Sequence, residues 1–450
     1  MNRRNFLAGL PFTGYSLVVA ADKLPPAPME PASVDDIRAR IDPLTPVKPG
    51  LPRAAGEPHM TLVDLETDLL VAGGGLAGVC TAIAAARHGA KVVLVQDRSR
   101  LGGNSSSEVK MHVVGANSRH KGWREGGILE EIRLADAVNN PQRCWELWDL
   151  LLYDKVVSER NITLLLDSTL YSARRKGDRI EEALVRSDRT EHIYRIKAKM
   201  FCDATGDSRL ALEAGAEMRT GREARTEFGE SLAMEKADNE TLGSSILFTA
   251  RHYDRPMPFT PPSWARKITR EHLQFRPVRS WEYGYWWIAW GGNKDTIHDD
   301  QRIRFELLSI VMGVWDYIKN SDDHPSSASW ALDWVGMIPG KRGSRRLVGD
   351  YILNQKDLEN GGQFDDAVAL GGWPMDDHPP GGFDRIEVKP NIAIHTPDVF
   401  NIPLRSLYSK NIANLVMAGR NISCSHVAFT STRVMATCAG VGQAAGTAAA

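Results

Sequence analysis

The chain has 450 residues, more than one hydrophobic core usually serves, so its length predicts two or three domains. With 42% hydrophobic and 25% charged residues its composition is globular, which argues against a disordered or fibrous protein. The 55 Lys and Arg residues balance the 56 Asp and Glu residues, so we expect neither nucleic acid nor an anionic membrane surface as a partner. No later segment is apolar for long enough to predict an integral membrane span.

The cysteines and histidines predict no redox or metal centre built from the chain itself. The histidines include no HExxH motif and no pair at helical spacing, so no metal site is expected. The five cysteines form no CxxC pair, no haem-attachment motif and no disulfide framework; they are Cys80, Cys144, Cys202, Cys424 and Cys438. Any redox chemistry must therefore come from a bound cofactor.

The N-terminal segment resembles a twin-arginine signal peptide. Arg3 and Arg4 precede Asn5-Phe6-Leu7, and a short, weakly apolar stretch follows up to a small-residue exit at Ala21. We expect residues 1–21 to direct export, with the folded protein periplasmic or secreted; the alternative is a disordered tail that happens to hold two arginines. Residues 22–59 are rich in proline and are predicted to form a linker.

A dinucleotide-binding turn is predicted after the first apolar strand, Leu69–Ala72. The following glycines fill a G-x-G-x-x-G pattern, an alanine-rich helix runs from there to Gly89, and a second buried strand is expected at Lys91–Val95. Gly73 permits the tight turn, Gly75 lets a diphosphate approach the backbone, and Gly78 allows close packing of helix on strand. The helix N-terminus then offers free N–H groups and partial positive charge to the phosphates.

The residue that should hold the adenosine ribose is ambiguous. An acidic side chain usually ends the second strand, but Gln96 occupies that place and Asp97 follows it. A glutamine can hydrogen-bond a hydroxyl without the strength of a carboxylate, so either residue is a candidate.

Three further motifs extend this pattern along the chain. They are LGGNSSSE with Gly102 and Gly103, CDATGD with residues 203–207, and NLVMAGRNI with Gly419 and Arg420. Together with VAGGGLAG, REGGILEEI and GKRGSRRLVGDYIL, they resemble the FAD-dependent oxidoreductase family, of the glutathione-reductase-like type found in secreted bacterial flavoproteins. In that group an aspartate often stands where this chain has Arg420, which could instead pair with a phosphate oxygen.

The resemblance implies an α/β fold in which a Rossmann-like FAD-binding domain is split by a substrate domain. We expect the FAD domain over 60–220 and 396–450 and a mixed α+β substrate domain over 221–395. The residues expected to contact FAD are Gly73, Gly75, Gly78, Gln96, Asp97, Gly102, Gly103, Asn104, Ser105, Thr205, Gly206, Asp207, Gly419, Arg420 and Ser431. The glycines of 440–446 could suggest a nicotinamide site, but they follow a helix, so helix packing explains them better.

The flavin ring is expected where the two FAD segments meet the substrate domain, beside Asn104–Glu108 and the loop Asn421–Thr432. For Asn104–Glu108 a solvated loop is the alternative. In the second loop Thr430, Ser431 and Thr432 are predicted to cap the final helix, which is expected over about 431–450. That helix lacks a C-terminal cap, so it either frays or continues beyond the sequence given.

Three side chains are candidates for catalysis. His426, just ahead of the expected caps, could remove the proton of a substrate alcohol while hydride passes to flavin N5. His378 in MDDHPPGGFD is a weaker candidate, because DDHPP also suits a surface turn. Arg345, next to Arg346, could clamp an anionic group or form part of a solvated basic face.

Aromatic residues are concentrated in the expected substrate domain, where eight of the 12 tryptophans lie between Trp264 and Trp334. Aromatic faces can stack on sugar C–H surfaces, which hints at a carbohydrate-like ligand. The alternative for the stretch 280–292 is a strand that buries one face in a core.

The sequence therefore predicts an FAD-dependent oxidoreductase that oxidises an alcohol or related C–H bond of a small molecule. Electrons would leave to oxygen, a quinone or a carrier protein, since the chain has no second redox centre. Two alternatives remain: a C=C reductase of the fumarate-reductase-like type that uses Arg345, and a lyase or glycan-binding protein in which FAD is structural or redox-neutral.

Overall fold

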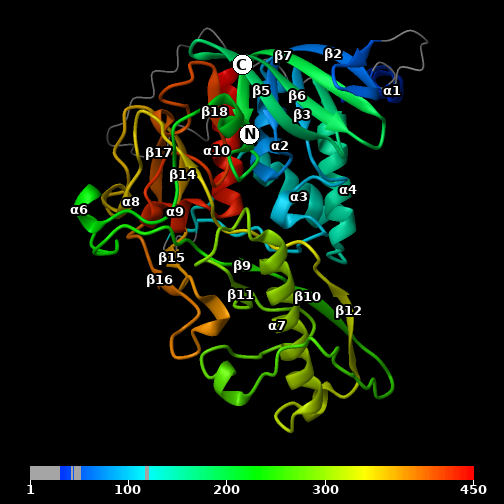
Figure 1. Ribbon diagram of the computed structural model, residues 1–450, viewed down its shortest axis with the longest axis vertical. Helices are drawn as coiled ribbons and strands as arrows, with labels where there is room; N and C mark the ends of the chain where they lie inside the picture. The colour runs from blue at the N-terminus through cyan, green and yellow to red at the C-terminus, as the bar shows by residue number, and fades with distance from the viewer. Residues whose placement is uncertain (1–30, 42–43, 45–51, 117–120) are drawn as a thin grey trace, which may run out of the picture. The chain divides into compact units, whose positions relative to one another are not determined.

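The computed structural model describes residues 31–41, 44, 52–116 and 121–450. Its main element is an 8-stranded sheet with the order β4-β3-β2-β7-β6-β5, in which β1 also pairs with β2 and β18 with β7 (Figure 1). Strands β2, β3, β4, β7 and β18 are mutually parallel where they pair, whereas β5, β6 and β1 join antiparallel. The strands are β1 (Arg53–Ala54), β2 (Glu57–Ala72), β3 (Val92–Val95), β4 (Ile162–Leu165), β5 (Thr169–Lys176), β6 (Arg179–Ser187), β7 (His192–Asp203) and β18 (Leu415–Met417). This topology confirms the expected α/β fold.

Strand β2 is much longer than its predicted core, Leu69–Ala72. It starts at Glu57, and its register with β7 runs from Thr61 opposite His192 to Ala72 opposite Asp203. The last four residues of β2 are the one continuous buried run in this strand. The earlier part mixes polar and apolar side chains and is mostly partly exposed. An apolar run therefore marks only the end of the strand that reaches the site.

Two helices with small side chains cover the start of the parallel sheet. They are α2 (Leu76–Arg87) and α10 (Met435–Ala449), and the other helices of this region are α3 (Ile128–Asn139), α4 (Trp145–Val157) and α5 (Arg209–Ala214). A Cβ atom on Gly442 would lie 2.2 Å from the Ala77 carbonyl oxygen, and one on Gly446 would lie 2.2 Å from that of Thr81. This close approach confirms that the glycines of 440–446 serve helix packing.

A separate hydrophobic core lies within 246–383. It is built around helix α7 (Asp300–Asn320), with β10 (Phe248–His252) paired to β12 (Trp330–Val335) and β9 (Ser244–Ser245) paired to β11 (Ala289–Trp290). Trp287, Trp290 and Trp315 are buried in this core, and the Trp287 ring stacks on Tyr285 with centroids 4.7 Å apart. Most of these aromatics therefore form core, although only Ala289–Trp290 of the stretch 280–292 is strand.

Short paired strands connect the remaining segments. Strand β8 (Met218–Arg219) pairs with β13 (Arg346–Leu347), β14 (Ala367–Gly371) with β17 (Phe400–Pro403), and β15 (Met375–Asp377) with β16 (Ile392–Ile394); the helices here are α6 (Arg225–Phe228), α8 (Gln355–Glu359) and α9 (His426–Thr432). Two of these pairs cross the expected limits of the substrate domain at 221 and 395, and those limits stay a prediction.

The predicted signal peptide, 1–21, lies outside the described residues. The predicted linker over 22–59 stays a prediction; in its described part lie helix α1 (Val34–Ile41), strand β1 and the start of β2. The Arg40 guanidinium fastens α1 by donating to the backbone carbonyls of Val157 and Glu159, both at 2.6 Å. Within the described residues, no helix combines the length and apolar character needed to cross a membrane.

Candidate functional site

A cavity of about 1140 Å³ opens at the carboxyl ends of the parallel strands β2, β3 and β7. Ligands of open α/β sheets bind at this edge. The volume exceeds the roughly 300–1,000 Å³ of an ordinary small-ligand pocket, so it has room for a large cofactor and a substrate. Most residues expected to contact FAD line it: Gly73, Gly75, Gln96, Asp97, Gly102, Gly103, Asn104, Thr205, Gly206, Asp207, Gly419 and Arg420; Gly78, Ser105 and Ser431 do not.

The three glycines of the turn before α2 have different surroundings. Gly73 has a φ of +102°, and a Cβ atom there would meet the Ala204 carbonyl oxygen at 2.3 Å. A Cβ on Gly78 would lie 1.8 Å from the Gly73 oxygen, so Gly78 keeps helix and turn in contact. A Cβ on Gly75 would meet nothing within 4 Å, because Gly75 faces the open cavity, and no side chain caps α2 there. Backbone and uncapped helix end therefore fit a diphosphate.

The side-chain amide of Gln96 stabilises this turn. Its carboxamide oxygen accepts from the Gly74 N–H at 2.8 Å, and its nitrogen donates to the Arg100 carbonyl at 2.9 Å. The side chain is buried and its amide is already engaged on both sides. Asp97 also lines the cavity, and its carboxylate is exposed and lies 3.8 Å from the Arg98 Nε. Of the two candidates for the ribose, Asp97 thus has the available carboxylate.

The segment Asn104–Glu108 is not a solvated loop. Ser105, Ser106 and Ser107 are buried, and Ser105 Oγ accepts from the Trp148 indole N–H at 3.2 Å. Asn104 lines the cavity and donates to the Lys341 carbonyl at 3.0 Å, which joins this segment to the opposite wall. Ser105 therefore supports the cavity wall from inside the protein and does not face the cavity.

Beyond the end of β7, Asp207 lines the cavity and accepts from several donors, which together we call the Asp207 cluster. Its carboxylate accepts from Arg420 at 2.7 Å, from Lys341 at 3.0 Å and from the Ser344 hydroxyl at 2.7 Å. Burial alone would raise the pKa of Asp207, but the charges of Arg420 and Lys341 outweigh it, and the pKa lies well below its usual value. Arg345 Nη1 donates to the Asp207 backbone oxygen at 3.2 Å.

A second polar group lines the same cavity. We call it the Asp376 cluster, and its members are Asp376, His378, Asn391, Arg342 and Arg433. Asp376 Oδ2 lies 3.2 Å from His378 Nε2 and accepts from Arg433 Nη2 at 3.2 Å, while Asn391 donates to Oδ1 at 2.6 Å. The Trp286 ring meets the His378 ring edge-on, with centroids 5.4 Å apart. Arg342 donates to the carbonyl oxygens of Gly243 at 2.6 Å and Trp286 at 2.9 Å.

His378 is a neutral imidazole with one nitrogen left over. Burial and the charge of Arg342 lower its pKa to about 4, against the hydrogen bond to Asp376. Burial would raise the pKa of Asp376, but its contacts with His378 and Arg433 hold the pKa well below its usual value, so the carboxylate is ionised. Nε2 must then carry the proton that it donates to Asp376. Nδ1 keeps a lone pair and has no partner in the described chain.

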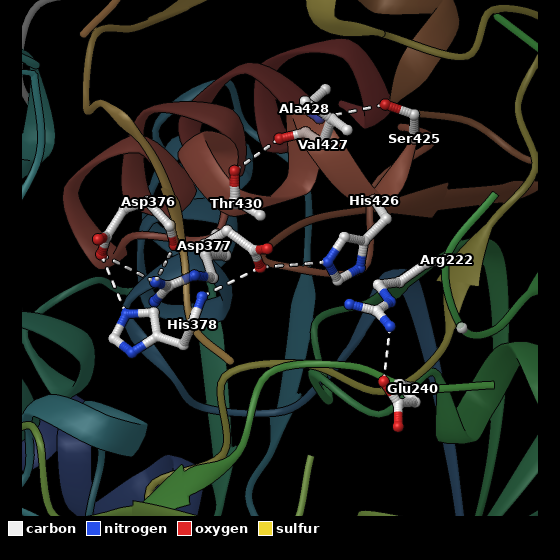
Figure 2. A network of polar contacts seen from close by, with 12 residues as sticks. Arg222, Glu240, Asp376, Asp377, His378, Ser425, His426, Val427, Ala428 and Thr430 are labelled. Carbon is white, nitrogen blue, oxygen red and sulfur yellow. Dashed lines mark hydrogen bonds and ion pairs between the residues drawn. The ribbon is translucent and has the colours of Figure 1, made fainter. Parts of the chain in front are cut away.

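The structure does not place His426 in this cavity. It is the first residue of α9, and with Asp377, Arg222 and Glu230 it lines a separate cavity of about 120 Å³. Figure 2 shows the Asp377 carboxylate between the His426 ring and the backbone of His378; Oδ1 is 3.5 Å from His426 Nε2 and accepts from the His378 N–H at 3.0 Å. Successive side chains of a strand point to opposite faces, so Asp376 and Asp377 serve different cavities.

The predicted helix caps are also wrong. Thr430, Ser431 and Thr432 lie inside α9, whose N-cap is Ser425, with its hydroxyl accepting from the Ala428 N–H at 3.1 Å. A second helix, α10, begins at Met435, because the chain turns at Arg433–Val434. Val434 and Met435 line the main cavity, so the helix end expected at the flavin belongs to α10.

Sequence reasoning missed most of the Asp376 cluster and found only His378. Arg342 lies in the GKRGSRR motif beside the residues that were singled out, and Arg433 is the one charge in the run from Asn421 to Ala450. A lone arginine in an otherwise small and apolar segment was the available signal. Arg346, by contrast, is fully buried against Glu223 at 2.6 Å, so it is neither a clamp nor a solvated charge. Among the described residues, no three potential metal ligands gather.

Comparisons with known proteins agree with this geometry. A family model described as FAD dependent oxidoreductase matches residues 68–450. Aklavinone 12-hydroxylase DnrF from Streptomyces peucetius is 37% identical over 84 residues, which are 18% of this chain and 16% of that enzyme. This chain thus matches only a small part of the curated relatives. The match confirms the expected cofactor, FAD, and the expected class of oxidoreductase.

Two solved structures align with most of the chain at low similarity. A geranylgeranyl bacteriochlorophyll reductase-like protein from Thermoplasma acidophilum shares 13% identity with a TM-score of 0.38, over 86% of this chain and 77% of that one. An adenosine-5-phosphosulfate reductase in complex with sulfite also shares 13% identity, with a TM-score of 0.36, over 90% of this chain and 72% of that one.

Proposed function

We infer that this chain, which belongs to the FAD-dependent oxidoreductase family, oxidises an alcohol of a small molecule with His378 as the base. One observation carries the proposal: the Asp376–His378 pair and the glycine turn of α2 line one cavity. A histidine held by a carboxylate in a chamber shared with a two-electron cofactor is equipped to take the proton of a hydroxyl group.

FAD, when bound, supplies the two-electron acceptor. The residues that would hold it are the Gly73–Gly75 turn and the start of α2 for the phosphates, Asp97 for the ribose, and the first turn of α10 for a negatively charged part of the ring. Arg420 is already paired with Asp207, which also pairs with Lys341, so Arg420 is a part of the cavity wall.

His378 accepts the alcohol proton at Nδ1. Its hydrogen bond to Asp376 fixes the tautomer that leaves Nδ1 free, and the neighbouring carboxylate stabilises the imidazolium that forms. Trp286 and Trp373 line the cavity, and the Trp286 ring meets the His378 ring edge-on. His426, which the sequence favoured for this role, lies on the other side of β15, so we assign the base to His378.

A second candidate function is the reduction of a C=C bond, favoured by the state of Arg342. Arg342 lines the cavity and bonds only to two backbone carbonyls, so its charge is placed to hold the carboxylate of an unsaturated acid. Arg345, the arginine first considered, is bound to the Asp207 backbone at the cofactor end. A chemically reduced holoprotein that is rapidly reoxidised by unsaturated acids would favour this second reaction.

The electron acceptor and the cellular compartment are also proposed. We propose that oxygen, a quinone or a carrier protein reoxidises the flavin after twin-arginine export to the periplasm. What supports this is the order of Arg3, Arg4, Phe6 and Leu7 at the N-terminus, together with scattered cysteines that form no second redox centre.

The proposal is tested by mixing the FAD-loaded protein with sugars, sugar acids and small hydroxy acids without oxygen and following the visible flavin absorbance. At least one alcohol should bleach the flavin. His378→Gln should slow that bleaching about 10²–10⁴-fold while FAD stays bound. His426→Gln is the matched control, a buried histidine beside the neighbouring carboxylate, and should change the rate little. Equal rates for the wild type and His378→Gln would remove His378 from the mechanism.

A further inference from the structure

We propose that the substrate is a hydroxy acid whose carboxylate binds Arg342 and Arg433 while its hydroxyl faces His378. This inference rests on the proposed oxidation and adds the substrate class. It is carried by an excess of buried positive charge and of unpaired donors at one end of the cavity, which the described chain itself leaves unsatisfied.

Arg342 is a buried cation without a carboxylate partner in the described chain. Its side chain is 8% exposed, and its guanidinium donates only to two backbone carbonyls, those of Gly243 and Trp286. Carbonyl oxygens satisfy two of its five N–H groups but do not neutralise its charge. A buried charge left in this state costs free energy, which an incoming anion would offset.

Arg433 adds a second guanidinium that is only partly paired. It bonds through Nη2 to the backbone oxygen and to Oδ2 of Asp376, and its Nε is buried with no partner among the described residues. Asp376 is the carboxylate shared with His378, which is neutral. Asp376 is thus the one carboxylate of the described chain within ion-pair distance of these two guanidiniums, and it pairs with Arg433; Asp377 acts on Arg433 only from farther away, and the charge of Arg342 has no close counter-ion in the described chain.

A third donor belongs to the same wall. The Trp373 indole N–H is buried without a partner in the described chain, and Trp373 lines the cavity beside Pro374. Buried polar groups in native proteins nearly always have a hydrogen-bond partner, so an unpaired group in a cavity wall indicates a ligand atom. A carboxylate is an acceptor on both oxygens and matches arginine in geometry, whereas a neutral sugar would leave the Arg342 charge uncompensated.

The reaction balances with these groups in place. The alcohol carbon loses a hydrogen with two electrons, which the oxidised FAD of the proposed function receives, and the hydroxyl proton goes to His378 Nδ1. The product is the corresponding oxo acid, whose carboxylate stays on the two arginines. Because the anion contacts are made by substrate and product alike, they set affinity more than the rate of the chemical step.

The test measures binding and oxidation separately on the FAD-loaded protein. Titration calorimetry compares two matched pairs that differ in charge: glycolate with glycolamide, and D-galacturonate with D-galactose. We expect at least one acid to bind while its neutral partner binds at least roughly 10-fold more weakly. Arg342→Gln and Arg433→Gln should each weaken that acid roughly 10–100-fold, whereas Arg342→Lys should lose less because it keeps the charge.

Two further variants distinguish the effect of a changed charge from general disruption of the site. Asp376→Asn removes the negative charge beside Arg433 and should strengthen acid binding, an effect that a merely disrupted site would not give. Arg195→Gln removes an exposed arginine paired with Asp64 and should leave binding unchanged. Neutral partners that bind as well as the acids, or an Arg342→Gln variant that keeps full affinity, would overturn the proposal. Acids that bind without bleaching the flavin would instead overturn the proposed oxidation alone.

Discussion

The two polar clusters of the cavity are built from similar residue types but differ in how their cations are paired. In the Asp207 cluster both cations have a carboxylate within the chain: Arg420 and Lys341 pair with Asp207, and Lys341 also lies 3.5 Å from Asp300, although Arg420 Nε has no partner among the described residues. In the Asp376 cluster only Arg433 pairs with the carboxylate, Arg342 bonds to two backbone carbonyls, and donor groups of Arg433 and Trp373 are left unpaired. Both clusters line the same space beside the glycine turn.

This difference separates a wall from a binding site. A buried charge network that is closed on itself is a scaffold, and breaking it leaves uncompensated charge. In a network with unpaired donors, a ligand that accepts their hydrogen bonds gains binding free energy. The contrast suggests that the Asp207 cluster shapes the cofactor end and that the Asp376 cluster selects the substrate.

The largest expected effect comes from the glycine turn before α2, which lines the same cavity as both clusters. Gly78→Ala places a Cβ about 1.8 Å from the Gly73 oxygen, so the turn must move, and we expect the purified protein to lack FAD. Gly75→Ala has free space and should leave the fold intact while weakening FAD by obstructing the phosphates. The ratio of flavin to protein absorbance and the melting temperature of the apoprotein distinguish the two variants. Equal FAD content in both would contradict the different roles.

The different roles of the two clusters are tested by removing the carboxylate of each cluster in turn. Asp207→Asn leaves Arg420 without its anion and Lys341 with only the more distant Asp300, and should lower the free energy of unfolding by about 3–5 kcal/mol. Asp376→Asn should cost less, because Arg433 also bonds to the backbone oxygen of Asp376. Urea denaturation at neutral pH measures both. A larger loss in Asp376→Asn would reverse the assignment of scaffold and binding site.

The pH dependence of the free energy of unfolding tests the role of the Asp207 cluster separately. The pKa of Asp207 is lower in the folded protein than in the unfolded chain, so its stabilisation is complete above the unfolded value of about 3.9 and is lost as the pH falls toward the folded value. The stability gap between wild type and Asp207→Asn should therefore be constant near neutral pH and shrink below about pH 4. A gap that does not change with pH would indicate that the variant acts through packing.

A smaller effect is expected in the pH dependence of flavin reduction. The base must be neutral, and the pKa of His378 is lowered to about 4 by burial, so the rate should stay flat down to about pH 5 and fall near pH 4. An unperturbed histidine would begin to lose activity near pH 6.5. Stopped-flow reduction between pH 4 and 8, with His426→Gln as the control, decides between the two profiles, and a midpoint near 6.5 would contradict the buried base.

The residues predicted to contact FAD are mostly brought together at one cavity because their sequence signals are local. Gly73, Gly75 and Gly78 act through the backbone of one turn, and their spacing alone places them. The start of β2 and the helix α1 were missed, because partly exposed, proline-rich segments show no apolar period.

The substrate end could not be predicted in the same way because it is assembled from distant segments. Arg342, Asp376 and Arg433 meet only in three dimensions, and His378 and His426 have equally good motifs on the two sides of one short strand. The alternation of β15 decides which histidine reaches the cavity, and a strand of three residues is too short to be recognised from its pattern.

The central claim is that one cavity holds FAD at the Asp207 end and a hydroxy acid at the Asp376 end. A crystal structure of the FAD-loaded His378→Gln variant with D-galacturonate or glycolate tests it most directly, because the variant should bind without turnover. We predict the diphosphate at Gly75 and the first turn of α2, and the carboxylate within hydrogen-bond distance of Arg342 and Arg433. A flavin ring that fills the space around Arg342, or an acid bound beside His426 in the smaller cavity, would contradict the account.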